Sequence, residues 1–151
     1  MKIEDLSLAE IVTAKPAAAF NSYNLTELID HIVNYHHQYV KDNMPVIQQH
    51  LKKVVIKHGD SYPYMKKIEK NFDEVCKDFS QHLMKEELIL FPKIRRIDPS
   101  TNSSNSISTI INIMEIEHQD AGQMMDEIKK LSNNYIVPQN VCVTFRLCLN
   151  P

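Results

Sequence analysis

Histidine and glutamate residues that interrupt apolar helix faces are the residues of this sequence best suited to do chemistry. On a helical wheel at 100° per residue, His82 and Glu86 lie one turn apart, inside the apolar stripe of their helix. His118 lies near the centre of the stripe of a later helix. Imidazoles and a carboxylate that point into a dry bundle can replace the water ligands of a transition metal ion. The pattern therefore indicates a metal site.

The first predicted helix offers three histidines on different bearings. His36 has a more central bearing than His31, which lies at the edge of the apolar stripe, so the wheel leaves both as ligand candidates. We expect His37, His50 and His58 at the surface, because they lie on polar faces or near a helix end.

Several alternatives to a single defined metal site remain open at this point. Each histidine can instead be a core residue satisfied by hydrogen bonds, with no metal bound. The ligand spacing does not choose among iron, manganese and zinc, or between one ion and two. Glu87, Glu115 and Glu117 can orient ligands, but we expect at least two of them to be exposed helix carboxylates.

Long helices must position these side chains. The apolar periodicity predicts three of them, over residues 24–56, 61–96 and 106–133. Asn24 and Glu27 form a capping box for the first helix, and we expect Pro45 to kink or restart it. Ser61 and Ser106 are suitable caps for the second and third.

A short apolar segment follows, over residues 139–149, and its pattern fits a strand or a helix. We predict an all-α fold, an antiparallel up-down bundle of three long helices plus a short or incomplete fourth. We expect residues 1–23 to form an amino-terminal helical segment and residues 24–151 to form the bundle.

Composition excludes several classes of function. The only two glycines, Gly59 and Gly122, cannot form a glycine-rich phosphate-binding loop. A formal charge of −2 gives no field for holding nucleic acid or an anionic membrane. The first residues lack the apolar core of a signal peptide, so we expect none, and no apolar run approaches the ~18 residues of a membrane span. Three cysteines without a CxxC pair fit a reducing compartment, so we expect a cytoplasmic protein.

Three motifs in order resemble the hemerythrin-like iron-sulfur cluster repair proteins (the RIC, or repair of iron centres, family). The motifs are DHI (30–32) with HHQY (36–39), HLMKEE (82–87) with LFP (90–92), and EIEHQDAG (115–122). The resemblance runs from about Leu25 to Asn134. It implies a four-helix bundle with a non-haem di-iron centre.

The resemblance also implies a function and a ligand set. The function is repair of iron-sulfur clusters damaged by nitric oxide or oxidative stress, as an iron donor in the stress response rather than as a turnover enzyme. The implied partners are damaged iron-sulfur proteins. The implied iron ligands are His31, His82 and His118, with Glu86 as a carboxylate that bridges the two irons.

The chain departs from this family at both ends. The family supplies a further His and Glu from its fourth helix, whereas no His, Asp or Glu follows Glu127, which suggests a truncated or frame-shifted member. Adjacent cysteines expected near the amino end are absent. We therefore weigh a mononuclear site completed by water, a homodimer that covers the open groove, and a metal-free bundle that acts as an interaction or remnant protein.

Of these outcomes we expect the homodimer, or else weak folding. The reason is that apolar residues of the last segment otherwise lack a partner surface. These residues are Cys142, Phe145, Leu147 and Leu149.

Overall fold

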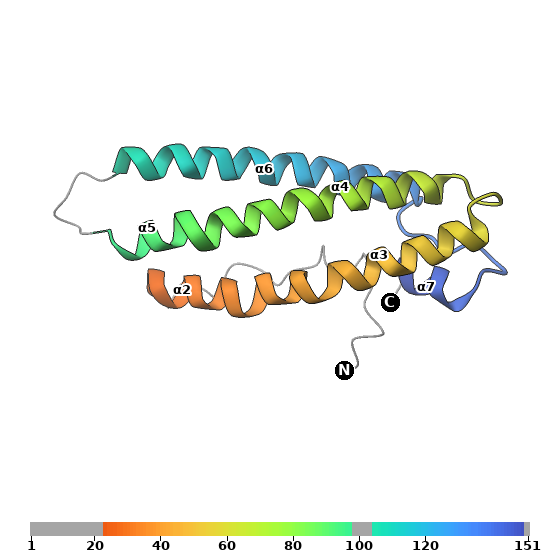
Figure 1. Cartoon of the computed structure of the whole chain (residues 1–151). Coiled ribbons are helices and arrows are strands. Elements are labelled where there is room, and N and C mark those ends of the chain that lie inside the picture. Colours follow the sequence, from red (N-terminus) through yellow and green to blue (C-terminus); the bar gives the residue numbers. More distant parts are fainter. Residues whose placement is uncertain (1–22, 98–103, 150–151) are drawn as a thin grey trace.

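The structure, a computed structural model, describes residues 23–97 and 104–149, with side chains described from residue 107 in the second range. Every regular element in these two ranges is helical (Figure 1). The predicted all-α bundle is thus confirmed. The predicted amino-terminal segment, 1–23, lies outside the described residues except for Tyr23.

The first long helix is continuous but changes its winding near its start. It comprises α2 (Leu25–His31), the π-helical segment η3 (Ile32–His37) and α3 (Gln38–His58). The predicted capping box is present: the Asn24 side chain accepts a hydrogen bond from the Glu27 backbone N–H, and the Glu27 carboxylate accepts one from the Asn24 N–H. The helix continues through Pro45 without a new start.

The second long helix has the same composite design. It comprises α4 (Tyr64–Lys85), the π-helical segment η4 (Glu86–Leu90) and α5 (Phe91–Arg95). It begins at Tyr64, three residues after the predicted cap. Buried side chains recur along α4 at the helical period, and they include Ile68, Phe72 and Leu83.

The third long helix, α6 (Ser104–Leu131), packs along α4. It ends where Asn133, Asn134 and Tyr135 take positive φ values of 51°, 59° and 61°. Consecutive left-handed residues cannot continue a right-handed helix. The chain therefore turns at the predicted position.

The last described element is α7 (Val143–Leu149), so the ambiguous apolar segment is a helix. It packs against α3 at one end of the molecule (Figure 1). Phe145, Cys148 and Leu149 are fully buried, and the Phe145 ring lies 5.3 Å from the Tyr62 ring and 5.5 Å from the His58 ring. The expectation that this segment lacks a partner surface is wrong, because α3 and the start of α4 supply one.

Two apolar clusters hold the described bundle together. The larger joins α3, α4, α6 and α7 around Leu51, Phe72, Ile128 and Phe145. The smaller joins Ile29, Leu90, Phe91 and Met114. Two histidines are buried among these helices, His37 on the first and His82 on the second.

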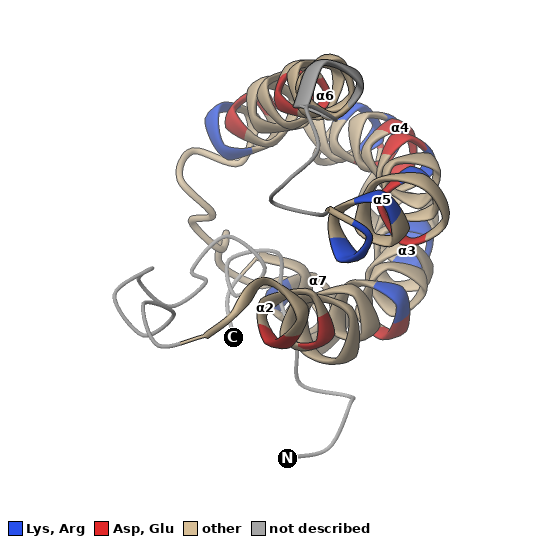
Figure 2. Cartoon of the chain, turned by 90° about the vertical axis from the view of Figure 1, so that its left-hand side faces the viewer, with Lys and Arg blue, Asp and Glu red and all other residues tan. Residues whose placement is uncertain are grey.

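Charged residues lie around the outside of the bundle with both signs interspersed (Figure 2). Within the described ranges, none of the helices combines the length and the apolar character needed to cross a membrane.

We predict that Phe145→Ala lowers the free energy of unfolding by about 3–5 kcal/mol, because it leaves a cavity under α7. Val143→Ala is the matched control on the same helix, since Val143 is 71% exposed, and we expect it to change stability by no more than about 0.5 kcal/mol. Urea denaturation followed by circular dichroism measures both. Equal effects of the two substitutions would mean that α7 does not pack on the core.

Candidate metal centre

Three of the residues singled out from the sequence come together between the second and third helices. His82 comes from α4, Glu86 is the first residue of η4 and His118 comes from α6. One ligand atom from each can be chosen so that all lie within 4.8 Å of one another. The His82 Nε2 is 2.7 Å from the His118 Nε2 and 3.3 Å from the Glu86 Oε1.

His37 supplies the fourth side chain of this site, and the expectation that it lies at the surface is wrong. Its side chain is only 5% exposed, and its Nε2 lies 3.0 Å from the Glu86 Oε2. The Phe91 ring stacks on its imidazole with centroids 5.7 Å apart. Glu86 therefore lies between two histidines, with one carboxylate oxygen toward each.

The π-helical segment explains why the helical wheel favoured the neighbouring residue. A π turn closes an i→i+5 hydrogen bond and so takes up one residue more than an α turn. Residues after the insertion are rotated back by about 100° relative to a continuous α-helix. His37, the last residue of η3, therefore takes the inward bearing that the wheel assigned to His36.

The other two histidines of the first helix lie elsewhere. His31 is half-buried and stacks on Tyr35 with ring centroids 4.7 Å apart. His36 is exposed and lies edge-on to His31 at 5.3 Å. The closely spaced donor group among the described residues is His82, Glu86 and His118, and His37 contacts that group at Glu86. The helical wheel offered His31 and His36 as ligand candidates and missed His37, which is the histidine of this helix that contacts Glu86.

His50 and His58 are half-buried rather than fully exposed. The ring of His58 packs against Phe145, which fixes the contact between α3 and α7. The surface prediction for these two residues is therefore only partly right.

Contacts within the site shift the pKa values of its side chains. Burial by itself raises the pKa of Glu86, but hydrogen bonds from His37 and His82 outweigh it and bring that pKa to about 2. The pKa of His82 is raised, chiefly by its hydrogen bond to Glu86. Burial lowers the pKa of His37, but its bonds to Glu86 and Glu87 prevail and raise it. The site is thus an ionised carboxylate that accepts hydrogen bonds from two imidazoles whose pKa values it raises.

Two further carboxylates contact the outer nitrogens of the histidines. The Glu87 Oε1 lies 2.7 Å from the His37 Nδ1, and the Glu117 Oε2 lies 2.8 Å from the His82 Nδ1. Their side chains are 27% and 28% exposed. The expectation that at least two of the three acids are simply exposed is wrong, because only Glu115 is.

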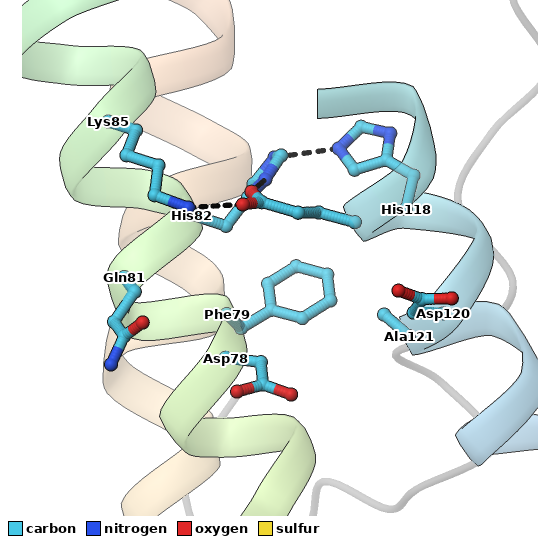
Figure 3. Close-up of a pocket in the computed structure, with 9 residues that line it drawn as sticks. Asp78, Phe79, Gln81, His82, Lys85, His118, Asp120 and Ala121 are labelled. Carbon is cyan, nitrogen blue, oxygen red and sulfur yellow. Dashed lines mark hydrogen bonds and ion pairs between the residues drawn. The ribbon is translucent and has the colours of Figure 1, made fainter. Parts of the chain in front are cut away.

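A surface pocket of about 170 Å³ opens beside His82 and His118 (Figure 3). Phe79 forms one wall, and Asp78 and Asp120 flank it on α4 and α6. Lys85 forms an ion pair with Glu117 at the same pocket. The His82–His118 pair is therefore accessible to small ligands from solvent.

The donor set fits a transition metal such as iron. Three imidazoles and a carboxylate with one oxygen toward each of two of them are ligands that iron, manganese or zinc accepts. His37 is buried, Glu86 is 13% exposed and His118 is exposed. The bundle geometry, the ligand types and their mutual spacing together define a hemerythrin-type cation-binding domain.

Comparison with known proteins agrees with this assignment. Residues 28–147 match the family model described as the hemerythrin HHE cation binding domain. The chain belongs to this family.

Characterised relatives carry the name iron-sulfur cluster repair protein YtfE. The protein from Escherichia coli O139:H28 is 29% identical over 150 residues, which cover 99% of this chain and 66% of that protein. The protein from Citrobacter koseri is 30% identical over 146 residues, which cover 97% of this chain and 64% of that protein. The chain thus spans slightly less than two thirds of the length of these relatives.

We predict that Glu86 stabilises the metal-free protein more at pH 6 than at pH 9. The raised pKa values of His37 and His82 favour the folded state below the unfolded pKa of about 6.5, and this gain is lost as the pH rises through the folded values. Urea denaturation of wild type and Glu86→Gln, each with a chelator at both pH values, measures the difference.

The difference between the two proteins is the informative quantity, because other groups also titrate in this range. His36 and His50, whose pKa values are lowered, respond in the opposite direction in both proteins. An advantage of wild type over Glu86→Gln that is the same at both pH values would contradict the described hydrogen bonds.

Proposed function

We propose that this chain binds non-haem iron through His37, His82, Glu86 and His118. The observation that carries the proposal is that His37 and His82 each contact one oxygen of the Glu86 carboxylate, while the His118 Nε2 lies 2.7 Å from the His82 Nε2. The match to a cation-binding domain and the likeness to proteins named for iron-sulfur cluster repair support iron as the metal. His37 replaces His31 in the ligand set inferred from the sequence.

Glu86 is suited to bridge two irons. Its Oε2 faces His37, and its Oε1 faces His82, which in turn meets His118. His37, His82, Glu86 and His118 would hold the iron, which would supply Lewis-acid and redox chemistry at this site. Water can fill the remaining positions, and a mononuclear site at His82 and His118 is the alternative.

The arrangement favours iron that can be exchanged. Bound iron would supply redox and ligand-binding chemistry toward oxygen or nitric oxide. Three features of the chain control access: His37 and Glu86 are buried, His118 is exposed, and the pocket opens beside His82. These properties suit an iron donor better than an enzyme that turns over a substrate.

We therefore place the chain in the repair of iron-sulfur clusters damaged by nitric oxide or oxidative stress, in the cytoplasm, with damaged iron-sulfur proteins as its partners. The support is the name and similarity of the relatives together with the site. The test is restoration of activity in a nitric oxide-treated iron-sulfur dehydratase by the iron-loaded chain, with free iron at equal concentration as the control.

A bundle without metal is the competing function, that of an interaction or remnant protein. The observation that favours it is that the polar groups of the site already satisfy one another by hydrogen bonds. Metal content decides between the two.

We predict about two irons per chain after anaerobic reconstitution, measured by mass spectrometry. His37→Ala should lower the count to about one or less, because it removes the ligand on one side of Glu86. His36→Ala is the matched control, since it removes the neighbouring, exposed imidazole and should leave the count unchanged. His82→Ala should abolish binding.

The outcomes separate the alternatives. One iron per chain in wild type, unaffected by His37→Ala, would establish the mononuclear site. No iron in wild type would leave the metal-free bundle. A loss of iron with His36→Ala but not with His37→Ala would contradict the proposed ligand set.

We also propose that the chain forms a homodimer. The original reason, an uncovered last segment, no longer holds, but α6 exposes the adjacent apolar side chains of Ile113 and Ile116, which are 46% and 58% exposed. Multi-angle light scattering tests it: a dimer that Ile116→Lys dissociates supports the proposal, and a monomer at all concentrations overturns it.

A further inference from the structure

Two similar chains of polar contacts lie on either side of Glu86. In each chain, the histidine proposed as a metal ligand is the residue that contacts Glu86. One chain runs Lys41–Glu87–His37 and the other runs Lys85–Glu117–His82. We propose that Glu87 and Glu117 are positioning residues, which hold His37 and His82 by Nδ1 and so reserve Nε2 for the metal. The inference rests on the proposed function, which supplies the metal.

The first chain is built across two helices. Glu87 belongs to η4, and its Oε1 lies 2.7 Å from the His37 Nδ1 and 2.7 Å from the Lys41 Nζ, both on the first long helix. A carboxylate near neutral pH only accepts hydrogen bonds, so the His37 Nδ1 must carry the proton. The other nitrogen of the ring is the one that faces Glu86, at 3.0 Å.

The second chain of contacts has the same arrangement between α6 and α4. Glu117 belongs to α6; its Oε2 lies 2.8 Å from the His82 Nδ1, and its Oε1 pairs with the Lys85 Nζ, both on α4. The ring nitrogen that remains, the His82 Nε2, faces Glu86 and His118. With a metal on Nε2, the same tautomer, protonated at Nδ1, would therefore be held at both histidines.

The lysines fix the carboxylates in turn. The pKa of Glu87 is lowered, first by its hydrogen bond from Lys41, and that of Glu117 is lowered because its bonds from Lys85 and His82 outweigh burial. Each acid also connects neighbouring helices, Glu87 joining η4 to α3 and Glu117 joining α6 to α4. Rotation of either histidine away from Glu86 would break a bond on each side of its ring.

Outer-sphere carboxylates of this kind orient a histidine ligand and make it more basic, and their loss typically lowers metal affinity about 10–100-fold. Loss of Glu87 or Glu117 leaves the inner ligands in place but removes this support. We therefore expect weaker binding without loss of a ligand.

The experiment loads the whole chain with Co²⁺ and measures affinity by competition with a chromophoric chelator. Glu87→Ala and Glu117→Ala should each weaken binding about 10–100-fold. Glu74→Ala and Glu115→Ala are matched controls, because each removes an exposed glutamate from the same long helix, and they should leave affinity unchanged. Glu87→Gln and Glu117→Gln keep an acceptor oxygen and should restore most of the affinity.

A proton NMR signature separates positioning from general destabilisation. In Co²⁺-loaded wild type, the Nδ1–H protons of His37 and His82 should give strongly shifted signals that disappear in D₂O. Glu87→Ala should remove or broaden the His37 signal alone, and Glu117→Ala the His82 signal alone. Loss of affinity in an alanine variant with both signals intact would overturn the positioning role.

The failures of the two proposals are distinguishable. If wild type binds neither Co²⁺ nor iron, the proposed function is wrong and the positioning role falls with it. If wild type binds metal and the alanine variants bind equally tightly, only the positioning role is wrong. Should an alanine variant fail to fold, the glutamine variants still decide: retained affinity with both signals present supports the role, and wild-type affinity with a signal lost overturns it.

Discussion

The burial of one carboxylate, that of Glu86, constrains the rest of this structure. Its side chain is 13% exposed, and a charge taken this far out of water needs partners. His37 and His82 provide them from two helices, one at each oxygen. These contacts bring the pKa of Glu86 to about 2 even though burial opposes ionisation. The first and second long helices must therefore each place an imidazole beside Glu86, and their close packing in the bundle makes that possible.

Much of the fold could be predicted from the sequence, because it depends on apolar periodicity. The three long helices, the Asn24 capping box and the turn after α6 are local features with clear signals. The type of the last segment could not be predicted, since a run such as residues 141–149 fits a strand as well as a buried helix. Its packing against α3 is what decides the matter.

The candidate site was only partly predictable, and the reason is geometric. His82, Glu86 and His118 lie where regular α-helical phase places them. His37 does not, because the π-helical segment before it inserts one residue into the turn, and a wheel with a fixed angle has no means of showing this. The adjacent histidines His36 and His37 could have indicated the site. If one extra residue is inserted into the turn before them, His37 takes the inward position that His36 would have in a regular α-helix. Glu87 and Glu117 could not be assigned either, because their partners lie on other helices.

The side chains proposed to bind the metal also pair with one another when no metal is bound. Without metal, the Glu86 carboxylate is paired with the His37 and His82 imidazoles; a cation held by the same side chains would replace those contacts, while the Nδ1 contacts to Glu87 and Glu117 need not change. The polar network is therefore satisfied in both states, so losing the ion does not leave a buried charge without a partner. An iron donor, the role proposed for this chain, would need this property, because it would have to stay folded after releasing its iron. A site whose ligands depended on the metal for their only contacts would lose its structure along with the ion.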